Sequence, residues 1–320
     1  MIRYIIRRLL WGVVLLILVS ALTFLFFRIF PTASPAQLRA GRIQNPKIIH
    51  EINVDLGLNK PLLTQFWIYM KGIFLHFNLG YSYYSSAPVK ELILSRLSDT
   101  VSLVLGGAVI WLLSGLAVGI ISARRPRSRL DRFSMGGALV LVSAPEYWLG
   151  LIVLFLFASD IGKVRIFPGA GSYVGLTSDP VKWFTSLILP WLVVAAGNAA
   201  IYARLMRGSL IETMSEDYIR TARAKGLSER RVVLRHGVRG AINPILTILG
   251  LDIGILLGSS VLVETVFEIP GIGLLNFQAI THSDFPIVQG TVLIAAFFII
   301  IANIVVDIAY AYLDPRVRYQ

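Results

Sequence analysis

Six long apolar stretches restrict what this 320-residue sequence can fold into. The stretches run approximately over residues 9–30, 100–123, 133–159, 183–203, 245–263 and 287–313. Each has about the 20 apolar residues that a helix needs to cross a hydrocarbon core about 30 Å thick. Lipid offers the backbone no hydrogen-bond partner, so each stretch must be helical. The sequence therefore predicts an all-α polytopic membrane protein with six transmembrane helices.

The alternative is a large soluble protein with buried core helices. Such helices keep a polar face with a period of 3.6 residues, whereas residues 101–121 have apolar residues all round. The composition also favours the membrane, because 56% of the residues are apolar and only 15% are charged. Cysteine is absent, which excludes disulfides and thiolate metal sites.

The basic residues indicate the orientation in the membrane. Lys and Arg close to a span tend to stay in the cytoplasm. With the N-terminus inside, 19 of the 30 Lys and Arg residues fall in inner segments. We therefore expect both termini in the cytoplasm, and the net charge of +12 requires no nucleic-acid partner. The first stretch is too long for a signal peptide and is followed by Pro31 and Pro35, so we expect an uncleaved anchor.

The chain divides into an N-terminal transmembrane helix at residues 1–30, an outer segment at residues 31–99 and a five-helix core at residues 100–320. The outer segment is too long for a turn and too short to bury a core of its own. We expect helices over residues 45–56, ended by Gly57, and over residues 61–77. Apolar residues recur every three or four positions in the second helix, which favours packing on the protein's own spans over lipid binding. They are Leu62, Phe66, Tyr69, Ile73 and Phe77.

The cytoplasmic segment at residues 204–243 contains short helical pieces. Ser215 is expected to cap a helix by accepting a bond from the first free backbone N–H groups. Lys225 and Gly226 mark the end of that helix, because glycine readily takes the left-handed conformation. A helix over residues 216–225 is too short to persist alone in water. It must therefore dock on something.

No pattern of residues points to catalysis or to a metal site. The phosphate-binding sequence Gly-x-x-x-x-Gly-Lys-Ser/Thr does not occur, so any ATP must bind another chain. The 4 histidines are scattered, and no metal-ligand cluster stands out. Serine, histidine and acidic residues show no nucleophile-elbow arrangement. We expect that the chain itself is not an enzyme.

The cytoplasmic segment resembles the EAA loop of ABC importer permeases. Residues 216–227 read Glu-Asp-Tyr-Ile-Arg-Thr-Ala-Arg-Ala-Lys-Gly-Leu, and Asn-Pro follows at 243–244. The variant is similar to that of the dipeptide/oligopeptide/nickel import family, the binding-protein-dependent transport system inner membrane components. Four further pieces agree in order and spacing: residues 56–61 (Leu-Gly-Leu-Asn-Lys-Pro), 143–150 (Ser-Ala-Pro-Glu-Tyr-Trp-Leu-Gly), 268–273 (Glu-Ile-Pro-Gly-Ile-Gly) and 313–316 (Leu-Asp-Pro-Arg). The likeness covers essentially the whole chain.

This resemblance implies a type I ABC importer permease (MetI-like) fold in the inner membrane of a bacterium or archaeon. It implies a second homologous permease subunit, two ABC ATPase subunits and an extracytoplasmic substrate-binding protein as partners. ATP and Mg would be held by the ATPase subunits, and this chain would hold no cofactor. The implied function is ATP-driven import by alternating access, with di- or oligopeptides as cargo and nickel chelates, glutathione or oligosaccharides as alternatives. A self-contained secondary transporter or channel is the competing class. Such proteins often form their pathway between two internal repeats, and the six spans of this chain show no such repeat.

The resemblance also assigns coupling to the ATPase subunits to the short cytoplasmic helix. The residues implied are Glu216, Asp217, Tyr218, Arg220, Ala222, Arg223, Ala224 and Gly226. The small residues would let a partner groove approach closely, and Arg220 and Arg223 would pair with acidic groups on its rim. The competing interpretation is a basic loop that meets anionic lipid.

Acidic residues inside the expected spans are candidates for the translocation path, because ionisable groups there are costly. Asp307 lies near an inner end, where we expect a structural pair with a cytoplasmic Arg. Asp252 either lines the path or bonds to a neighbouring helix. Pro145 breaks the third span, and Glu146 beside it is the best candidate for a cavity residue. Relatives tend to carry a small or polar residue in place of Glu146 and Gly-Asp-Leu-Gly where residues 77–80 read Phe-Asn-Leu-Gly, so both departures bear on the cargo.

The outer connection at residues 265–285 is a candidate gate. It contains acidic residues but no Lys or Arg, and Phe267, Glu268, Pro270 and Gly271 lie at its expected turn. A plain connecting turn is the alternative.

Overall fold

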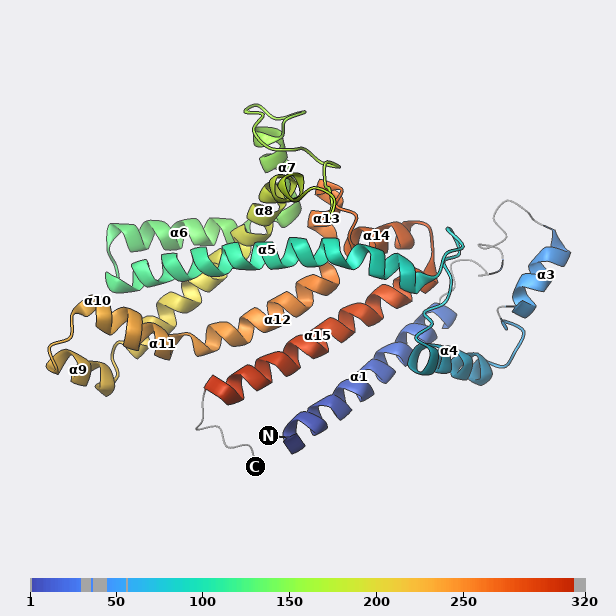
Figure 1. Ribbon diagram of the computed structural model, residues 1–320, viewed down its shortest axis with the longest axis horizontal. Helices are drawn as coiled ribbons and strands as arrows, with labels where there is room; N and C mark the ends of the chain where they lie inside the picture. The colour runs from blue at the N-terminus through green and yellow to red at the C-terminus, as the bar shows by residue number, and fades with distance from the viewer. Residues whose placement is uncertain (1, 30–35, 37–44, 56, 314–320) are drawn as a thin grey trace.

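The computed structural model describes residues 2–29, 36, 45–55 and 57–313, and its regular elements are helices (Figure 1). They are α1 (Ile2–Ile29), α3 (Pro46–Asp55), α4 (Leu62–His76), α5 (Val89–Arg124), α6 (Arg129–Ser143), α7 (Glu146–Phe157), α8 (Pro180–Thr213), α9 (Asp217–Ala224), α10 (Glu229–Arg231), the π-helix η1 (Val232–Gly237), α11 (Val238–Ala241), α12 (Asn243–Ser259), α13 (Val261–Phe267), α14 (Ile272–Thr281) and α15 (Phe285–Leu313). Pro31, Pro35, Leu56 and residues 314–320 lie outside the described residues.

Four of these helices are long and apolar enough to cross a membrane, namely α1, α5, α8 and α15. Two bent pairs also qualify: α6 with α7, bent by 104°, and residues 229–241 with α12, bent by 53°. Counting each bent pair as one span gives six in the described part of the chain. The expected six apolar spans are thereby confirmed on length and composition.

The third expected span, residues 133–159, consists of two helices that meet at a sharp angle. α6 ends at Ser143 and α7 begins at Glu146. Ala144 between them is extended, with φ −84° and ψ 126°, because the ring of Pro145 clashes with a helical backbone at the preceding residue. The expected break at Pro145 is confirmed, and it bends the third span sharply, since α7 turns away from α6 by 104°.

Several helix ends differ from the ends of the apolar stretches. α5 begins at Val89 and α8 continues to Thr213, both well beyond the expected spans. In the other direction, α12 ends at Ser259 and Ser260 separates it from α13, whereas a span to Val263 was expected. Hydropathy marks where lipid contact ends, but a helix continues as long as its backbone bonds and packing allow.

The helices are arranged with two distinct ends. Figure 1 shows α1, α5, α12 and α15 running alongside one another. The start of α1, the last turn of α15 and the short helices α9 to α11 lie at one end, and α4 and α14 lie at the other. All elements expected in the cytoplasm and described by the structure are thus at the same end of the bundle.

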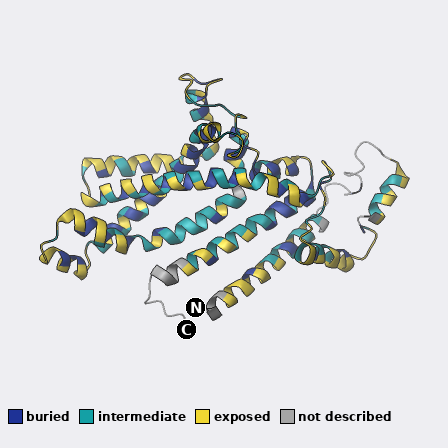
Figure 2. Ribbon diagram, in the orientation of Figure 1, coloured by how far each residue is buried: buried dark blue, intermediate teal, exposed yellow. Residues whose placement is uncertain are grey.

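α5 and α8 form the centre of the core. Trp111 of α5 and Tyr202 of α8 are fully buried, and their ring centroids are 6.2 Å apart. Trp191 Nε1 donates a 3.0 Å hydrogen bond to the carbonyl oxygen of Ser102. Figure 2 shows α5 with many buried and half-buried residues, whereas much of α1 is exposed. The exposed residues of α1 are largely apolar, as a lipid-facing helix requires.

α12 packs closely on α15 through small residues, which decides the direction of Asp252. A Cβ on Gly254 would lie 2.6 Å from Ala302 Cβ, and one on Gly258 would lie 2.5 Å from Ala295 Cβ. Such contacts let two helix backbones approach. Because two residues turn a helix through about 200°, Asp252 lies on the opposite side of α12. It therefore faces α8.

The outer helices α3 and α4 agree with the expected ones to within one residue at each described end. Phe24 of α1 lies with its ring centroid 5.6 Å from that of Phe66 and 5.4 Å from that of Tyr69. Packing of α4 on the protein's own first span is thereby confirmed for these two residues. Leu62 and Phe77 are exposed instead. Phe77 lies beyond the last helical turn, where a φ of 49° turns the chain away.

Ion pairs join helices at the end of the bundle that carries α9. Arg8 Nε donates to Asp307 Oδ2, which confirms the expected pair of Asp307 with an Arg. Asp131 of α6 accepts two bonds from Arg207 of α8, from Nε at 2.6 Å and from Nη2 at 2.8 Å. It also accepts the backbone N–H of Arg127 at 2.7 Å. These bonds fix the α5–α6 turn against the end of α8.

Replacing Asp131 with Ala is predicted to destabilise the fold, because Arg207 would keep its charge at a mostly buried site. Removing one partner of a buried pair destabilises by about 3 to 5 kcal/mol. The 27% exposure of the Arg207 side chain places the loss at or below the lower end of that range. Denaturant unfolding in detergent measures it. The double variant Asp131→Ala/Arg207→Met should be more stable than Asp131→Ala, and equal or lower stability would contradict the pairing.

Candidate functional site

The segment after α8, which we expect in the cytoplasm, folds into a short helix that packs on its own neighbours. α9 agrees with the expected helix to within one residue at each end. Ile219 and Ala222 face inward and pack with the buried Val232 of η1, with Met214 and Leu227 at the edge of this cluster. The 8 residues of α9 make a rod about 12 Å long, which is too short to be stable in water without such packing.

Backbone geometry sets both ends of α9. The expected cap by Ser215 is wrong, because its hydroxyl donates to the carbonyl oxygen of Glu212 at 2.6 Å within the turn that closes α8. Glu216 is the N-cap residue and makes no side-chain bond to the backbone. The expected end at Gly226 is confirmed: its φ of +75° is the left-handed conformation in which glycine carries little strain.

Arg223 is held within the chain by an ion pair that we did not expect. Its Nε lies 3.1 Å from Glu229 Oε2, and its Nη2 lies 2.8 Å from Glu229 Oε1. This two-pronged geometry is the strong form of an Arg–carboxylate pair, and it ties α9 to α10. Arg220 makes only a 3.4 Å contact with Asp217, and both side chains are largely exposed. Arg220 is therefore the more available of the two cations.

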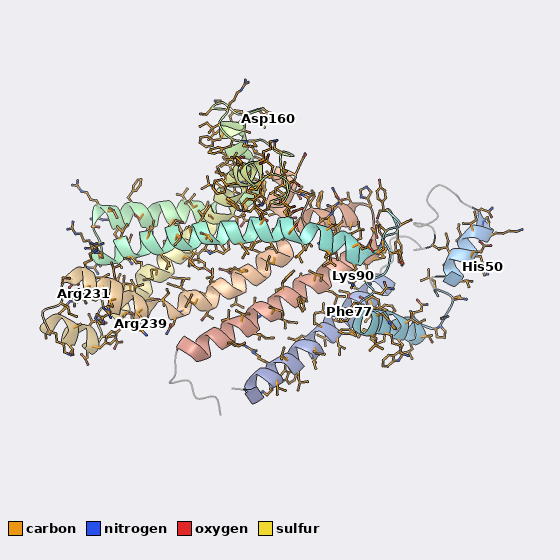
Figure 3. The ribbon with its side chains drawn as sticks, in the orientation of Figure 1. His50, Phe77, Lys90, Asp160, Arg231 and Arg239 are labelled. Carbon is orange, nitrogen blue, oxygen red and sulfur yellow. The ribbon has the colours of Figure 1, made fainter. Side chains whose placement is uncertain are left out.

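Tyr218 links α9 to the helix that precedes α12. Its hydroxyl lies against Gly240, next to the last residue of α11. Partial burial raises the pKa of the Tyr218 phenol, and the carboxylate of Glu216 adds to this effect. Figure 3 shows Arg231 and Arg239 at the same end of the molecule, so α9 lies in a basic environment.

The small residues of α9 do not all face the same way. Ala222 is buried in the segment's own cluster, so its size serves internal packing. Ala224 and Gly226 are exposed, and no heavy atom of the described residues lies within 4 Å of a Cβ built on Gly226. Asp217 and Arg220 are also exposed. The exposed side of α9 thus combines small residues with both signs of charge.

Glu146 lies in the first turn of α7, directly after Pro145. It is half-buried, and none of the described residues is within hydrogen-bonding or ion-pair distance of its carboxylate. A Cβ on Gly150, one turn further on, would lie 3.0 Å from Val266 and 3.4 Å from Phe267. α7 is therefore anchored on α13 while Glu146 keeps a carboxylate with no structural bond.

Asp252 bonds to a neighbouring helix, which was one of the two alternatives expected for it. Its Oδ2 accepts a 2.8 Å hydrogen bond from the hydroxyl of Tyr202. Among the described residues, no hydrogen bond or ion pair joins Asp252 of α12 to Glu146 of α7, so the structure does not pair the two candidate path residues. The second carboxylate oxygen of Asp252 has no bond among the described residues.

Glu264 is a buried carboxylate that the sequence analysis missed, and it joins three helices. Its Oε1 accepts the hydroxyls of Thr100 at 2.8 Å and Ser260 at 2.5 Å. Its Oε2 accepts the backbone N–H of Leu274 at 3.0 Å, and the hydroxyl of Thr100 accepts the N–H of Ile272 at 2.8 Å. The carboxylate thus caps the start of α14, where the helix dipole favours an anion.

This cap accounts for much of the turn that was expected to form an outer gate. A Cβ on Gly271 would collide with the carboxylate of Glu264, so only glycine fits there. Phe267 is buried, whereas Glu268 and Pro270 are exposed. Glu268 ends α13 with a φ of +54°. Gly271 and Phe267 therefore have structural roles in this turn, whether or not the turn also acts as a gate.

The sequence did contain a signal for the missed acids. Glu264 follows the expected end of the fifth span, Val263, by one residue and stands among apolar neighbours in residues 261–267. Asp284 likewise stands directly before α15 and is buried. An acid within an apolar run is costly unless it is paired. This cost predicts a bonded partner for each of the two acids.

Comparison with protein families covers nearly the whole chain. Residues 115–319 match the model described as "Binding-protein-dependent transport system inner membrane component", and residues 1–104 match the corresponding N-terminal model. A putative peptide transport system permease protein of Brucella abortus (strain 2308) is 39% identical over 316 residues, covering 99% of each chain. The glutathione transport system permease protein GsiC of Escherichia coli O6:H1 is 38% identical over 320 residues, covering 100% of each chain.

Among solved structures, the fold is similar to that of the methionine ABC transporter MetNI in an inward-facing conformation. The TM-score is 0.55 at 16% sequence identity, over 70% of this chain and 97% of that chain. At this identity the likeness concerns the fold alone. With the family match, it confirms the expected importer permease fold.

Replacing Glu264 with Met is predicted to lower stability, because the apolar side chain would leave the Leu274 N–H and two buried hydroxyls without their acceptor. Each unsatisfied buried group destabilises by about 1 to 3 kcal/mol. Unfolding in detergent measures the loss. Glu268→Met is the matched control on the same turn and should change stability by no more than about 0.5 kcal/mol. Equal losses in the two variants would contradict the role of Glu264 as a cap.

Proposed function

Because the chain belongs to the family of binding-protein-dependent transport system inner membrane components, we propose that it forms half of the path of an ATP-driven importer. The family places it as a multi-pass permease component of an ABC transporter. In our proposal a second homologous permease supplies the other half, two ABC ATPase subunits bind in the cytoplasm, and an extracytoplasmic binding protein delivers the cargo. ATP and Mg bind to the ATPase subunits.

One observation supports α9 as the element that couples the permease to an ATPase. α9 is braced on one side by the cluster of Ile219, Ala222 and Val232, and at its end by the Arg223–Glu229 pair. Its other side is exposed. A rod held in this way transmits a displacement as a rigid body, which an unbraced loop would absorb. The same feature disfavours a loop that only touches anionic lipid.

The proposed cycle follows from where α9 stands in the chain. It connects the inner end of α8 to the short helices that lead into α12. Closure of the ATPase pair would move α9, and α8 and α12 would shift with it to open the path outward. The outer connection with Phe267, Glu268, Pro270 and Gly271 is the proposed gate and would move with α13 and α14. Both termini lie in the cytoplasm in this arrangement.

We propose short peptides as the cargo class. This follows from relatives described as peptide and glutathione transport permeases, since glutathione is itself a modified tripeptide. Nickel chelates and oligosaccharides have no support among these relatives. The carboxylates of Glu146 and Asp252 are the proposed path groups, and each suits a cationic group such as a peptide amino terminus. Glu146 is the stronger candidate because no described residue bonds to it.

Replacing Gly226 with Val is predicted to uncouple uptake from ATP hydrolysis. A β-branched residue is strained at a φ of +75°, so α9 would lose its end geometry. Uptake of a short peptide into proteoliposomes loaded with ATP should fall at least tenfold in the assembled complex. Gly226→Asn is the matched control, because Asn tolerates the left-handed conformation, and it should keep most of the uptake.

Two further measurements decide how that result is to be understood. Co-purification of the ATPase subunits with each variant shows whether docking survives, and ATP hydrolysis shows whether the motor still runs. Full uptake by a correctly inserted Gly226→Val complex, or by one that lacks residues 216–226, would contradict coupling through α9. An absence of ATPase subunits from the native complex would contradict the proposed function as a whole.

Replacing Glu146 with Gln and Asp252 with Asn tests the proposed path. Each change removes a negative charge and keeps the shape of the side chain. We expect Glu146→Gln to reduce the uptake rate several-fold and Asp252→Asn to reduce it less, because Tyr202 already bonds to Asp252. The measurement is uptake of cationic and neutral dipeptides at saturating binding protein. Normal uptake by both variants would exclude them as path determinants.

A further inference from the structure

A pocket with a volume of about 220 Å³ opens at the outer end of the bundle, between the loop before α5 and the turn from α14 to α15. Leu92 and Ile287 contribute apolar surface to its lining. Its polar lining includes Arg96, Gln278 and His282. The ring of Tyr84 lies against that of His282, with the centroids 4.4 Å apart and the planes tilted by 33°. The pocket thus combines apolar walls with a guanidinium group.

The acid that lines this pocket, Asp284, is already satisfied by the loop. Its Oδ2 accepts the hydroxyl of Ser82 at 2.5 Å and the backbone N–H of Tyr84 at 3.1 Å. Its Oδ1 accepts the backbone N–H of Tyr83 at 3.1 Å. The residue is 1% exposed. These three donors hold the loop in place, and the carboxylate is not within salt-bridge distance of Arg96.

Arg96 therefore lacks a counter-ion among the described residues. It lies on α5 and lines the pocket, and it makes no hydrogen bond or ion pair with any described residue. The next acid along α5, Asp99, accepts the hydroxyl of Tyr173 at 2.9 Å instead. An unpaired guanidinium beside apolar walls favours an anion, and a carboxylate matches its two-pronged donor geometry.

His282 fits the same ligand. Its Nδ1 lies 2.7 Å from the carbonyl oxygen of Gln278. A carbonyl oxygen only accepts, so Nδ1 carries the proton, and Nε2 is left for another partner. The side-chain amide of Gln278 supplies further donors in the same lining.

We propose that this pocket is an anchor for the delivering binding protein and takes up one of its Asp or Glu side chains. The inference rests on the proposed function, because it requires such a protein. The family description itself names dependence on a binding protein. Arg96 would bind the carboxylate, and the apolar walls and the Tyr84 ring would enclose the methylene groups of the side chain.

Size and position favour a protein side chain over cargo as the source of the carboxylate. At about 220 Å³, the pocket is below the range of about 300 to 1,000 Å³ that is usual for small-ligand sites. That space suits one side chain rather than a whole peptide. Its lining comes from the outer loop, the outer part of α5 and the α14–α15 turn. Neither Glu146 nor Asp252 is part of it.

The experiment uses the complete transporter in nanodiscs together with its purified binding protein. We expect Arg96→Glu to raise the Kd of the binding protein at least tenfold, because it places two carboxylates face to face. Arg96→Gln should raise it less and should make binding less sensitive to salt. Lys90→Glu is the matched control: Lys90 is exposed on the same end of α5 (Figure 3) and does not line the pocket. It should change the Kd by less than about twofold.

Each other outcome overturns the anchor. An unchanged Kd in Arg96→Glu and Arg96→Gln would exclude it, and equal effects of Arg96→Glu and Lys90→Glu would reduce it to general surface charge. If the Arg96 variants left the Kd of the binding protein unchanged but raised the cargo concentration needed for half-maximal uptake, the pocket would be a cargo site. Basal ATP hydrolysis and ATPase co-purification, measured on the same preparations, report on the proposed function separately. If Arg96→Glu fails to assemble, Arg96→Gln with the salt series decides the question.

Discussion

A carboxylate in a dry environment needs donors, and this requirement connects the helices of the bundle. Glu264 of α13 binds groups on α5 and α14. Asp131 of α6 binds Arg207 of α8, Asp307 of α15 binds Arg8 of α1, and Asp252 of α12 binds Tyr202 of α8. Apolar packing alone gives little specificity between helices in lipid, since lipid tails are as apolar as the side chains. The acids therefore specify which helices are neighbours.

The same requirement separates structural polar groups from candidate functional ones. Among the described residues, the carboxylate of Glu146 and the guanidinium of Arg96 have no partner within the chain. Arg223 was expected to pair with a partner protein, yet its guanidinium is bound by Glu229 within the chain. The buried carboxylate of Asp284 is likewise bound by the loop that carries Ser82. A polar group left without a bond at a costly site is the better candidate for a ligand, because the fold gives no other reason to keep it.

The sequence was sufficient to predict the number of spans, the ends of α9 and the break at Pro145. Each of these depends on residues close together in the chain: apolar length, a left-handed glycine, or the clash before a proline. The bend of 104° between α6 and α7 and the partners of Glu264 depend on contacts between distant segments. The Ser215 cap was wrong for a related reason, since the turn that closes α8 competes for the same hydroxyl. Local chemistry therefore identifies elements, and packing decides which of the possible bonds are made.

The buried bonds also divide the bundle in a way that bears on coupling. Asp131 and the α5–α8 core hold α5, α6 and α8 as one group, and the α12–α15 packing and the Arg8–Asp307 pair hold α1, α12 and α15 as another. α9 lies in the connection between these groups at the inner end. Glu264 of α13, which follows α12, bonds to Thr100 of the first group. Asp252 of the second group bonds to Tyr202 of the first. In the proposed coupling, a displacement of α9 would act on both groups, because α9 connects α8 to the helices that lead into α12. The bond between Asp252 and Tyr202 crosses the boundary between the two groups, so its loss would uncover a carboxylate between them.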